Sequence, residues 1–198
     1  MNLSYIKKTG HNIVELFEDL AQLRIQVFRD FPYLYEGTLE YEKEYLETYS
    51  RSDKAMVFTV YDGLKMVGAT TAIPLADETL DVQAPFIAAG IDLHKIFYFG
   101  ESILLKPYRG LGLGHRFMDE RELHAKTSGA YTHTSFCAVV RPDDHPARPY
   151  DYRANDAFWI KRGYVQQPQL QTTFEWPDIG ETTSTHKPMI YWMKPIER

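Results

Sequence analysis

The chain has 198 residues, which is enough for one domain with a sizeable core, and its 44% apolar and 25% charged residues are ordinary for a globular protein. A formal net charge of −5 argues against nucleic-acid binding, which favours a basic surface. The single cysteine, Cys137, excludes an internal disulfide and favours a reducing, cytoplasmic compartment. No apolar run has the length of a signal peptide or of a membrane span, so we expect neither.

The first part of the chain predicts one strand, two helices and a hairpin. Residues 3–7 predict a short strand, and Asn12 is a candidate N-cap for a helix that continues to Phe28 on an apolar stripe of 3.6-residue spacing. An aromatic loop over residues 31–37 separates it from a second helix, residues 38–49. Tyr41, Tyr45 and Tyr49 share one face of that helix, which we expect to pack on the sheet, with a wall of the substrate site as the alternative. Residues 55–61 and 65–73 predict a hairpin about Asp62-Gly63.

The second part predicts four strands, two helices and one further short helical segment. Residues 77–95 are irregular apart from a short helix near 85–89, and residues 96–105 predict a central strand. A helix follows to Ser128-Gly129, with Leu113, Phe117 and Leu123 expected on its apolar face. Then come a strand (131–140), a long loop (141–153), a short helix (154–162) and two closing strands (164–174 and 189–194). No linker divides the chain, which predicts one domain over residues 1–198 with a mixed α/β (α+β), mostly antiparallel sheet flanked by helices.

A glycine-rich turn, Arg109-Gly110-Leu111-Gly112-Leu113-Gly114, joins the central strand to its helix. The first N–H groups of a helix lack intrahelical partners, and glycines let an anion approach them closely. We therefore expect a phosphate or pyrophosphate cradle, with Arg109 adding a charged donor at its edge. No Lys-Ser or Lys-Thr follows, as a P-loop requires, and Phe117 stands where a dinucleotide fingerprint has its third glycine. A glycine turn that binds nothing is the alternative.

The pattern R-x-x-G-x-G resembles the acetyl-CoA pyrophosphate loop of the GNAT superfamily of N-acetyltransferases. The approach Leu104-Leu105-Lys106-Pro107-Tyr108 and the segment from Asn155 to Tyr164 are also similar to GNAT motifs, and the order of elements agrees across nearly the whole chain. The resemblance implies transfer of an acetyl group from acetyl-CoA to an amine. It places the thioester carbonyl at the backbone N–H of Leu104 or Leu105, and coenzyme A beside Asn155, Phe158 and Trp159.

Glu101 is the candidate general base of that reaction. It lies four residues before Leu105, so strand alternation puts both side chains on one face. The alternatives are a strand-end glutamate in a salt bridge and a bulge residue set by Gly100. The family often has its general acid, a tyrosine, at the position of Trp159, which has no suitable proton. Tyr152 or solvent is then the candidate acid.

The acceptor is expected between the loops at 31–37 and 141–153. Tyr33, Tyr35 and Glu36 offer aromatic faces and a negative charge that suit an ammonium group. Arg141, Arg148 and Arg153 would instead suit a carboxylate or the 3′-phosphate of coenzyme A. The sequence leaves a polyamine, an amino acid, an antibiotic and a peptide terminus open.

Several other interpretations stay open. A nucleophilic Cys137 assisted by His133 or His145 is a minor alternative, and the histidine spacing predicts no metal site. The rival functions are a GNAT-fold protein that binds acyl-CoA without transfer, as a sensor or structural subunit, and another enzyme that uses the glycine turn for a nucleotide phosphate. The closing strands leave a homodimer open.

Overall fold

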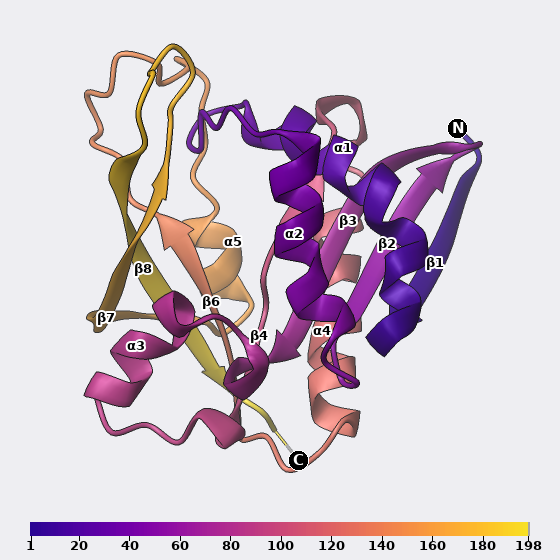
Figure 1. Cartoon of the computed structure of the whole chain (residues 1–198), viewed down its shortest axis with the longest axis vertical. Helices are drawn as coiled ribbons and strands as arrows, with labels where there is room; N and C mark the ends of the chain where they lie inside the picture. The colour runs from indigo at the N-terminus through magenta and orange to yellow at the C-terminus, as the bar shows by residue number, and fades with distance from the viewer. Residues whose placement is uncertain (198) are drawn as a thin grey trace.

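The computed structural model describes residues 1–197 and shows a central sheet between two layers of helices (Figure 1). The strands are β1 (Leu3–Thr9), β2 (Met56–Asp62), β3 (Lys65–Pro74), β4 (Ile96–Tyr98), β5 (Ser102–Leu104), β6 (His133–Val139), β7 (Val165–Trp176) and β8 (Thr185–Pro195). The α-helices are α1 (Phe17–Phe28), α2 (Leu39–Ser50), α3 (Leu80–Ala88), α4 (Leu113–Thr127) and α5 (Asp156–Lys161). Short 3₁₀ helices are η1 (Gly10–Leu16), η2 (Leu75–Asp77), η3 (Leu93–Lys95) and η4 (Lys106–Tyr108).

The sheet has the strand order β1-β2-β3-β4-β6-β8-β7, and β5 pairs with β3 outside this path. Within residues 1–197 the pairing of β4 with β6 is parallel, and the other named strand pairs are antiparallel. The predicted mixed, mostly antiparallel sheet flanked by helices is therefore confirmed. No helix in this described part is long and apolar enough to cross a bilayer.

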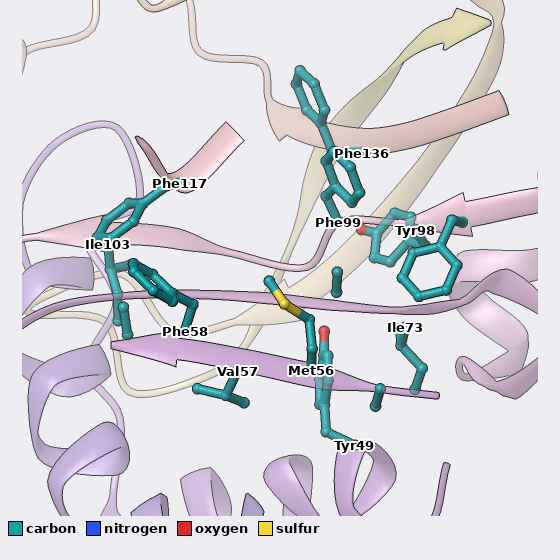
Figure 2. Close-up of a cluster of buried hydrophobic side chains, with 14 of the residues drawn as sticks. Tyr49, Met56, Val57, Phe58, Ile73, Tyr98, Phe99, Ile103, Phe117 and Phe136 are labelled. Carbon is teal, nitrogen blue, oxygen red and sulfur yellow. The ribbon is translucent and has the colours of Figure 1, made fainter. Parts of the chain in front are cut away.

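Helices cover both faces of the sheet. The pair α1 and α2 lies on one face and α4 on the other, with α5 behind β6 and β8 (Figure 1). Figure 2 shows Phe99, Phe117 and Phe136 on one side of the strands and Tyr49 on the opposite side. These side chains are at most 5% exposed, so apolar burial on both faces fixes the two helical layers.

Three expected elements differ from the structure. The first helix begins as the 3₁₀ turn η1, so Asn12 lies inside that turn and is not an N-cap. The helix α3 starts at Leu80, earlier than expected, with Pro85 in its interior. The single strand expected over residues 96–105 is divided into β4 and β5.

The prediction of the apolar face of α4 is also partly wrong. Leu113 and Phe117 are buried as expected, but Leu123 is 57% exposed. The position four residues after Phe117 belongs to Arg121, which is buried in place of an apolar residue.

Candidate active site

The central strand is interrupted by a β-bulge between β4 and β5. Tyr98 pairs with Ile73 and Ser102 pairs with Thr70, so residues 99–101 lie opposite only residues 71–72 of β3. One extra residue on one strand is the definition of a bulge, and it breaks the alternation of side chains. Glu101 belongs to this bulge, which was one of the alternatives left open by the sequence.

Backbone bonds to Thr71 hold the bulge in place. The Gly100 N–H donates to the Thr71 carbonyl (3.2 Å), and the Glu101 N–H donates to Thr71 Oγ1 (3.1 Å). A side chain at position 100 is excluded, because its Cβ would lie 2.0 Å from the hydroxyl of Tyr49. The glycine therefore lets α2 approach the strand and fixes where the Glu101 side chain emerges.

The sheet opens immediately after the bulge. The parallel pairing of β4 with β6 ends at Ser135, whose carbonyl accepts the Phe99 N–H at 2.7 Å. From there β5 pairs with β3, whereas residues 136–139 of β6 pair with β8. The neighbouring strands therefore part at Phe136.

Alternation along β5 shows which of the two expected backbone donors faces this opening. The Leu105 N–H donates to the Val67 carbonyl of β3 at 3.0 Å, so it is occupied by the sheet. Because backbone groups alternate along an extended strand, the N–H and C=O of Leu104 point away from β3. The Leu104 carbonyl accepts a bond from Arg109 Nε at 3.1 Å, which agrees with this direction. Of the two expected donors, Leu104 is the one that faces the opening.

Glu101 is buried in a network of charges between the sheet and α1. Its side chain is 5% exposed, and its Oε1 lies 2.7 Å from Arg24 Nη1. Arg24 also pairs through Nε with the fully buried Glu42 and lies over the ring of Tyr45 at 4.2 Å. Burial acts to lower the pKa of Arg24, but the neighbouring Glu101, Tyr45 and Glu42 raise it well above its ordinary value. The guanidinium is therefore charged and is shared by two carboxylates.

Two tyrosines of α2 extend this network to a third buried carboxylate. Tyr45 donates to Glu101 Oε2 at 3.5 Å, the Tyr45 and Tyr49 hydroxyls are 3.2 Å apart, and Tyr49 donates to Glu78 Oε1 at 3.1 Å. Burial raises the pKa of Glu78 to about 7, although the Thr79 N–H and the Tyr49 hydroxyl both act to lower it. On the face of α2 that we expected to pack on the sheet, the hydroxyl groups of Tyr45 and Tyr49 are therefore linked by hydrogen bonds. Tyr41, on the same face, is 56% exposed.

Arg121 approaches the same bulge from the opposite face of the sheet. It is 4% exposed, lies 4.5 Å over the ring of Phe99, and its Nη1 donates to the Glu101 carbonyl at 3.5 Å. Burial lowers the pKa of Arg121 to about 10, so it is still charged at neutral pH. No carboxylate lies within ion-pair distance of it among residues 1–197, which leaves its charge directed at the bulge.

Two of the expected site tyrosines, Tyr33 and Tyr152, lie in or beside the loop that follows α1. Burial raises the pKa of Tyr33, and the charges of Cys137 and Glu101 act in the same direction. Tyr152 packs edge-on against Phe31 at 4.7 Å between ring centres, and burial raises its pKa as well. Both expected tyrosines thus pack on aromatic rings at the end of α1 and in the loop that follows it, Tyr33 on Phe28 and Tyr152 on Phe31.

The environment of Cys137 does not favour a nucleophile. Its Sγ is 3.1 Å from the hydroxyl of Tyr98, and burial raises its pKa to about 12. A thiol with this pKa is almost entirely protonated at neutral pH, and the thiolate is the reactive form. His133 instead contacts Thr132, and His145 packs against Phe31.

The loop between α1 and α2 is fixed by Arg141. Its guanidinium binds both carboxylate oxygens of Asp178 at 2.8 Å and donates to the carbonyls of Pro32 and Tyr33 at 2.8 Å. Tyr35 forms a β-bridge with Asp178, which ties the loop to the β7–β8 hairpin (Figure 1). Arg141 is therefore occupied by the fold, while the expected substrate residue Glu36 is exposed and pairs with Arg29 at 2.8 Å.

The glycine turn has the geometry of an open helix N-terminus. Gly110 and Gly112 have φ values of 77° and 81°, which favour glycine, and Gly112 is the N-cap of α4. Gly114 has no such requirement, and the nearest atom to a Cβ built on it is Phe158 Cζ at 3.9 Å. Because Gly114 has no side chain, the surface of the first turn of α4 stays open to a ligand. Arg109 is at the rim, 3.3 Å from Asp30.

The expected residues of α5 take different places around this turn. Phe158 packs edge-on against His115 at 4.9 Å, beside Gly114. Trp159 packs on Phe136 at 4.9 Å and on Trp192, at the base of the opening. Asn155 is exposed at the start of the helix. No group of three or more metal-binding side chains is present in the described residues.

Comparison with known proteins identifies the fold. No protein-family model matches the sequence, and no curated protein is significantly similar to it in sequence. Solved structures of GNAT acetyltransferases are similar over nearly their whole length. A GNAT-family acetyltransferase from Streptococcus pneumoniae has 15% identity, 98% coverage of this chain, 100% of its own and a TM-score of 0.60.

Two structures with bound ligands are similar to the same extent. An aminoglycoside 6′-N-acetyltransferase complexed with coenzyme A has 15% identity, covers 100% of this chain and 98% of its own, and has a TM-score of 0.58. NAA60 from Arabidopsis thaliana, in complex with a bisubstrate analogue, has 14% identity, covers 98% and 100%, and has a TM-score of 0.58. The expected GNAT fold is therefore confirmed.

Proposed function

We propose that this chain, which has the fold of the GNAT acetyltransferases, transfers an acetyl group from acetyl-CoA to an amine by direct attack. One observation carries the proposal. The sheet opens between β5 and β6 at the point where Glu101 is buried, and the same strand leads directly into the open N-terminus of α4. In this proposal, the helix N-terminus serves as the phosphate cradle and the buried carboxylate serves the reacting end of one binding slot.

The residues of the slot fit coenzyme A. The free N–H groups after Gly112 and the bare surface at Gly114 suit the pyrophosphate, because anions bind where helix N–H groups lack partners. The Leu104 N–H faces the slot and would hold the thioester carbonyl. Phe158 and Trp159 form the apolar wall on the α5 side. When bound, acetyl-CoA supplies an acyl group on a thioester, whose sulfur is a good leaving group.

Glu101 is the proposed base. A protonated amine cannot attack a thioester until it loses a proton, and a positioned carboxylate can accept it. The charge of Arg24 beside Glu101 balances a carboxylate in a site from which water is largely excluded. The guanidinium also fixes the side chain, so that the base is held in one orientation on the acceptor side of the slot.

Tyr152 is the proposed acid, with Tyr33 as a second hydroxyl on the same side. Burial raises the pKa of each, so both are protonated at neutral pH and are able to donate. Aromatic faces at Tyr33 and Tyr35 suit an ammonium group, which supports a cationic amine as acceptor. The high pKa of the Cys137 thiol argues against an acyl-cysteine route and in favour of direct attack.

A two-step experiment tests this function. The purified protein is first titrated calorimetrically with acetyl-CoA, ATP and NAD, and only acetyl-CoA is expected to bind. A panel of amines is then screened by following release of the free thiol. Glu101→Gln is expected to keep acetyl-CoA binding and lose at least a hundredfold in turnover, in the range general-base catalysis contributes.

The matched control is Glu47→Gln on the exposed side of α2, where Glu47 pairs with Arg51. It is expected to leave both binding and turnover unchanged. Binding of acetyl-CoA without turnover of any amine would favour an acyl-CoA-binding protein, for which Trp159 at the usual tyrosine position is the supporting observation. Binding of ATP or NAD in place of acetyl-CoA would refute the proposal.

A further inference from the structure

Glu78 is a buried carboxylate that has no part in the transfer proposed above. It follows η2 in the chain and is 7% exposed. Its Oε1 accepts the Tyr49 hydroxyl at 3.1 Å and its Oε2 accepts the Thr79 N–H at 2.9 Å. No cation lies within ion-pair distance of it among residues 1–197. An unpaired carboxylate is costly to bury, so its position requires a reason.

The geometry connects Glu78 to the proposed base through two hydroxyls. Tyr45 and Tyr49 are one turn apart on α2, and this spacing brings their hydroxyl oxygens to 3.2 Å. The outer members are Glu101, 3.5 Å from Tyr45, and Glu78, 3.1 Å from Tyr49. The missing side chain at Gly100 makes room for the Tyr49 hydroxyl, so the bulge itself is shaped around this chain.

We propose that Glu101, Tyr45, Tyr49 and Glu78 form a proton relay, which carries the proton taken from the acceptor amine away from the reaction site. The inference rests on the function proposed above. Glu101 gains a proton from the amine and gives it to the Tyr45 oxygen. Tyr45 gives its own proton to the Tyr49 oxygen, and Tyr49 gives its own to Glu78 Oε1. Each tyrosine gains one proton and loses one, so one proton moves and no charge stays on the tyrosines.

Hydroxyl groups permit this sequence because their hydrogens rotate. While Glu101 is ionised, Tyr45 donates to it; once Glu101 is protonated, the Tyr45 hydrogen turns toward Tyr49. Burial raises the pKa of both tyrosines well above 10, which keeps them neutral throughout. A pKa of about 7 lets Glu78 both accept and release a proton near neutral pH.

The surroundings of Glu78 support this role. The titratable or charged groups whose charges act on it come from every element around it: Tyr49 and Tyr45 on α2, Tyr98 on β4, Cys137 on β6, Tyr191 on β8, Glu101 of the bulge and Arg24 on α1. The four tyrosines and Cys137 are neutral at pH 7, because burial raises the pKa of each. The preceding residues Ala76 and Asp77 line an open surface cavity, which places solvent near the end of the chain.

Kinetics of two single variants and their combination test the relay. With an amine found in the screen, Tyr49→Phe and Glu78→Gln are each expected to lower kcat at least tenfold and to change KM less than twofold. The double variant is expected to be no slower than the slower single one, because members of one chain act as a unit. Tyr61→Phe, which removes a hydroxyl bonded to Asp19 outside the network, is the matched control and is expected to keep full activity.

The relay is refuted if either single variant keeps kcat within twofold, or if the two losses multiply in the double variant. Circular dichroism and thermal unfolding check that Tyr49→Phe is folded; if it is not, Tyr45→Phe, at a half-buried position, takes its place with the same expectations. If the network only stabilised the fold, the substitutions would lower the free energy of unfolding but would not cause this non-additive loss in kcat.

A second measurement separates failure of the relay from failure of the proposed function. If no amine is acetylated, the function fails, and the chain is then tested in the free protein by carbon-13 NMR of the glutamate carboxyl groups. The Glu101 resonance is expected to move as Glu78 titrates near pH 7, and this movement is expected to disappear in Tyr49→Phe. The relay is overturned if the Glu101 resonance does not shift as Glu78 titrates, or if it shifts by the same amount in Tyr49→Phe.

Discussion

Replacing Gly114 by alanine is expected to make the protein more stable and its binding of acetyl-CoA weaker. Gly114 is the second residue of α4 and has no positive φ. The added methyl group would meet only Phe158 Cζ, at an ordinary contact distance of 3.9 Å. Glycine costs a helix about 0.5–1 kcal/mol relative to alanine. At about 2–4 °C per kcal/mol for a chain of this size, Tm is expected to rise by about 1–4 °C.

The same methyl group is expected to obstruct the phosphate cradle. It would stand over the N–H groups of the first turn of α4, where close approach of a phosphate depends on the absence of a side chain. Loss of one charge-assisted hydrogen bond costs about 1.5–3 kcal/mol. This corresponds to an increase in the Kd for acetyl-CoA of roughly ten- to a hundredfold.

Thermal unfolding and calorimetric titration on one preparation measure the two effects together. The control is Gly112→Ala, where φ is 81° and a side chain costs about 1–2 kcal/mol of stability. The two variants are thus expected to move Tm in opposite directions while both weaken binding. If the Gly114→Ala protein binds acetyl-CoA as tightly as the wild type, the glycine turn is not the phosphate site.

Three further substitutions test the buried charges. Arg24→Met leaves two buried carboxylates without a counter-charge. The free energy of unfolding, measured in urea, is expected to fall by about 3–5 kcal/mol. A loss below about 1 kcal/mol would contradict the buried pairing. Burial raises the pKa of Glu78 to about 7 from 4.5, so the folded protein holds a proton that the unfolded chain releases. Stability is therefore expected to fall between about pH 4.5 and 7, and Glu78→Gln should remove this component; an unchanged pH dependence would contradict it. Arg141→Ala breaks bonds to three residues in two chain segments and is expected to cost about 2–4 kcal/mol while acetyl-CoA binding persists. Weakened binding would show that Arg141 also contributes to the CoA site.

The order of elements and the glycine turn could be predicted because their signals are local. Apolar residues at 3.6-residue or alternate spacing define helices and strands, and Gly110 and Gly112 stand where the backbone needs positive φ. The bulge at Glu101 could not be predicted in the same way. It depends on the register of two strands separated by about thirty residues, and strand registers are set by tertiary pairing.

The partners of Glu101 were missed for a related reason, although two of them left a signal. Arg24 lies on the apolar stripe of α1 and Arg121 lies four residues after Phe117 on the apolar face of α4. A charged residue on an apolar face predicts a buried partner, and here both guanidinium groups point at the bulge. The sequence does not show which carboxylate that partner is, because Glu42, Glu78 and Glu101 come from three different segments.

The proton balance of the proposed reaction explains why the site needs more than one acid–base group. An ammonium group that becomes an amide loses two protons, and the departing thiolate takes up only one at neutral pH. One proton must therefore leave a site from which water is largely excluded, whatever group protonates the sulfur. In the proposed mechanism Tyr152 protonates the sulfur, and the hydrogen-bonded chain from Glu101 to Glu78 carries the proton that leaves, so the two routes are separate. The presence of Trp159 at the usual position of the acid therefore affects only the protonation of the sulfur. Glu78→Gln is then expected to slow turnover most above about pH 7, where Glu78 of the wild type is ionised and can accept the proton, and least at low pH, where Glu78 is already protonated.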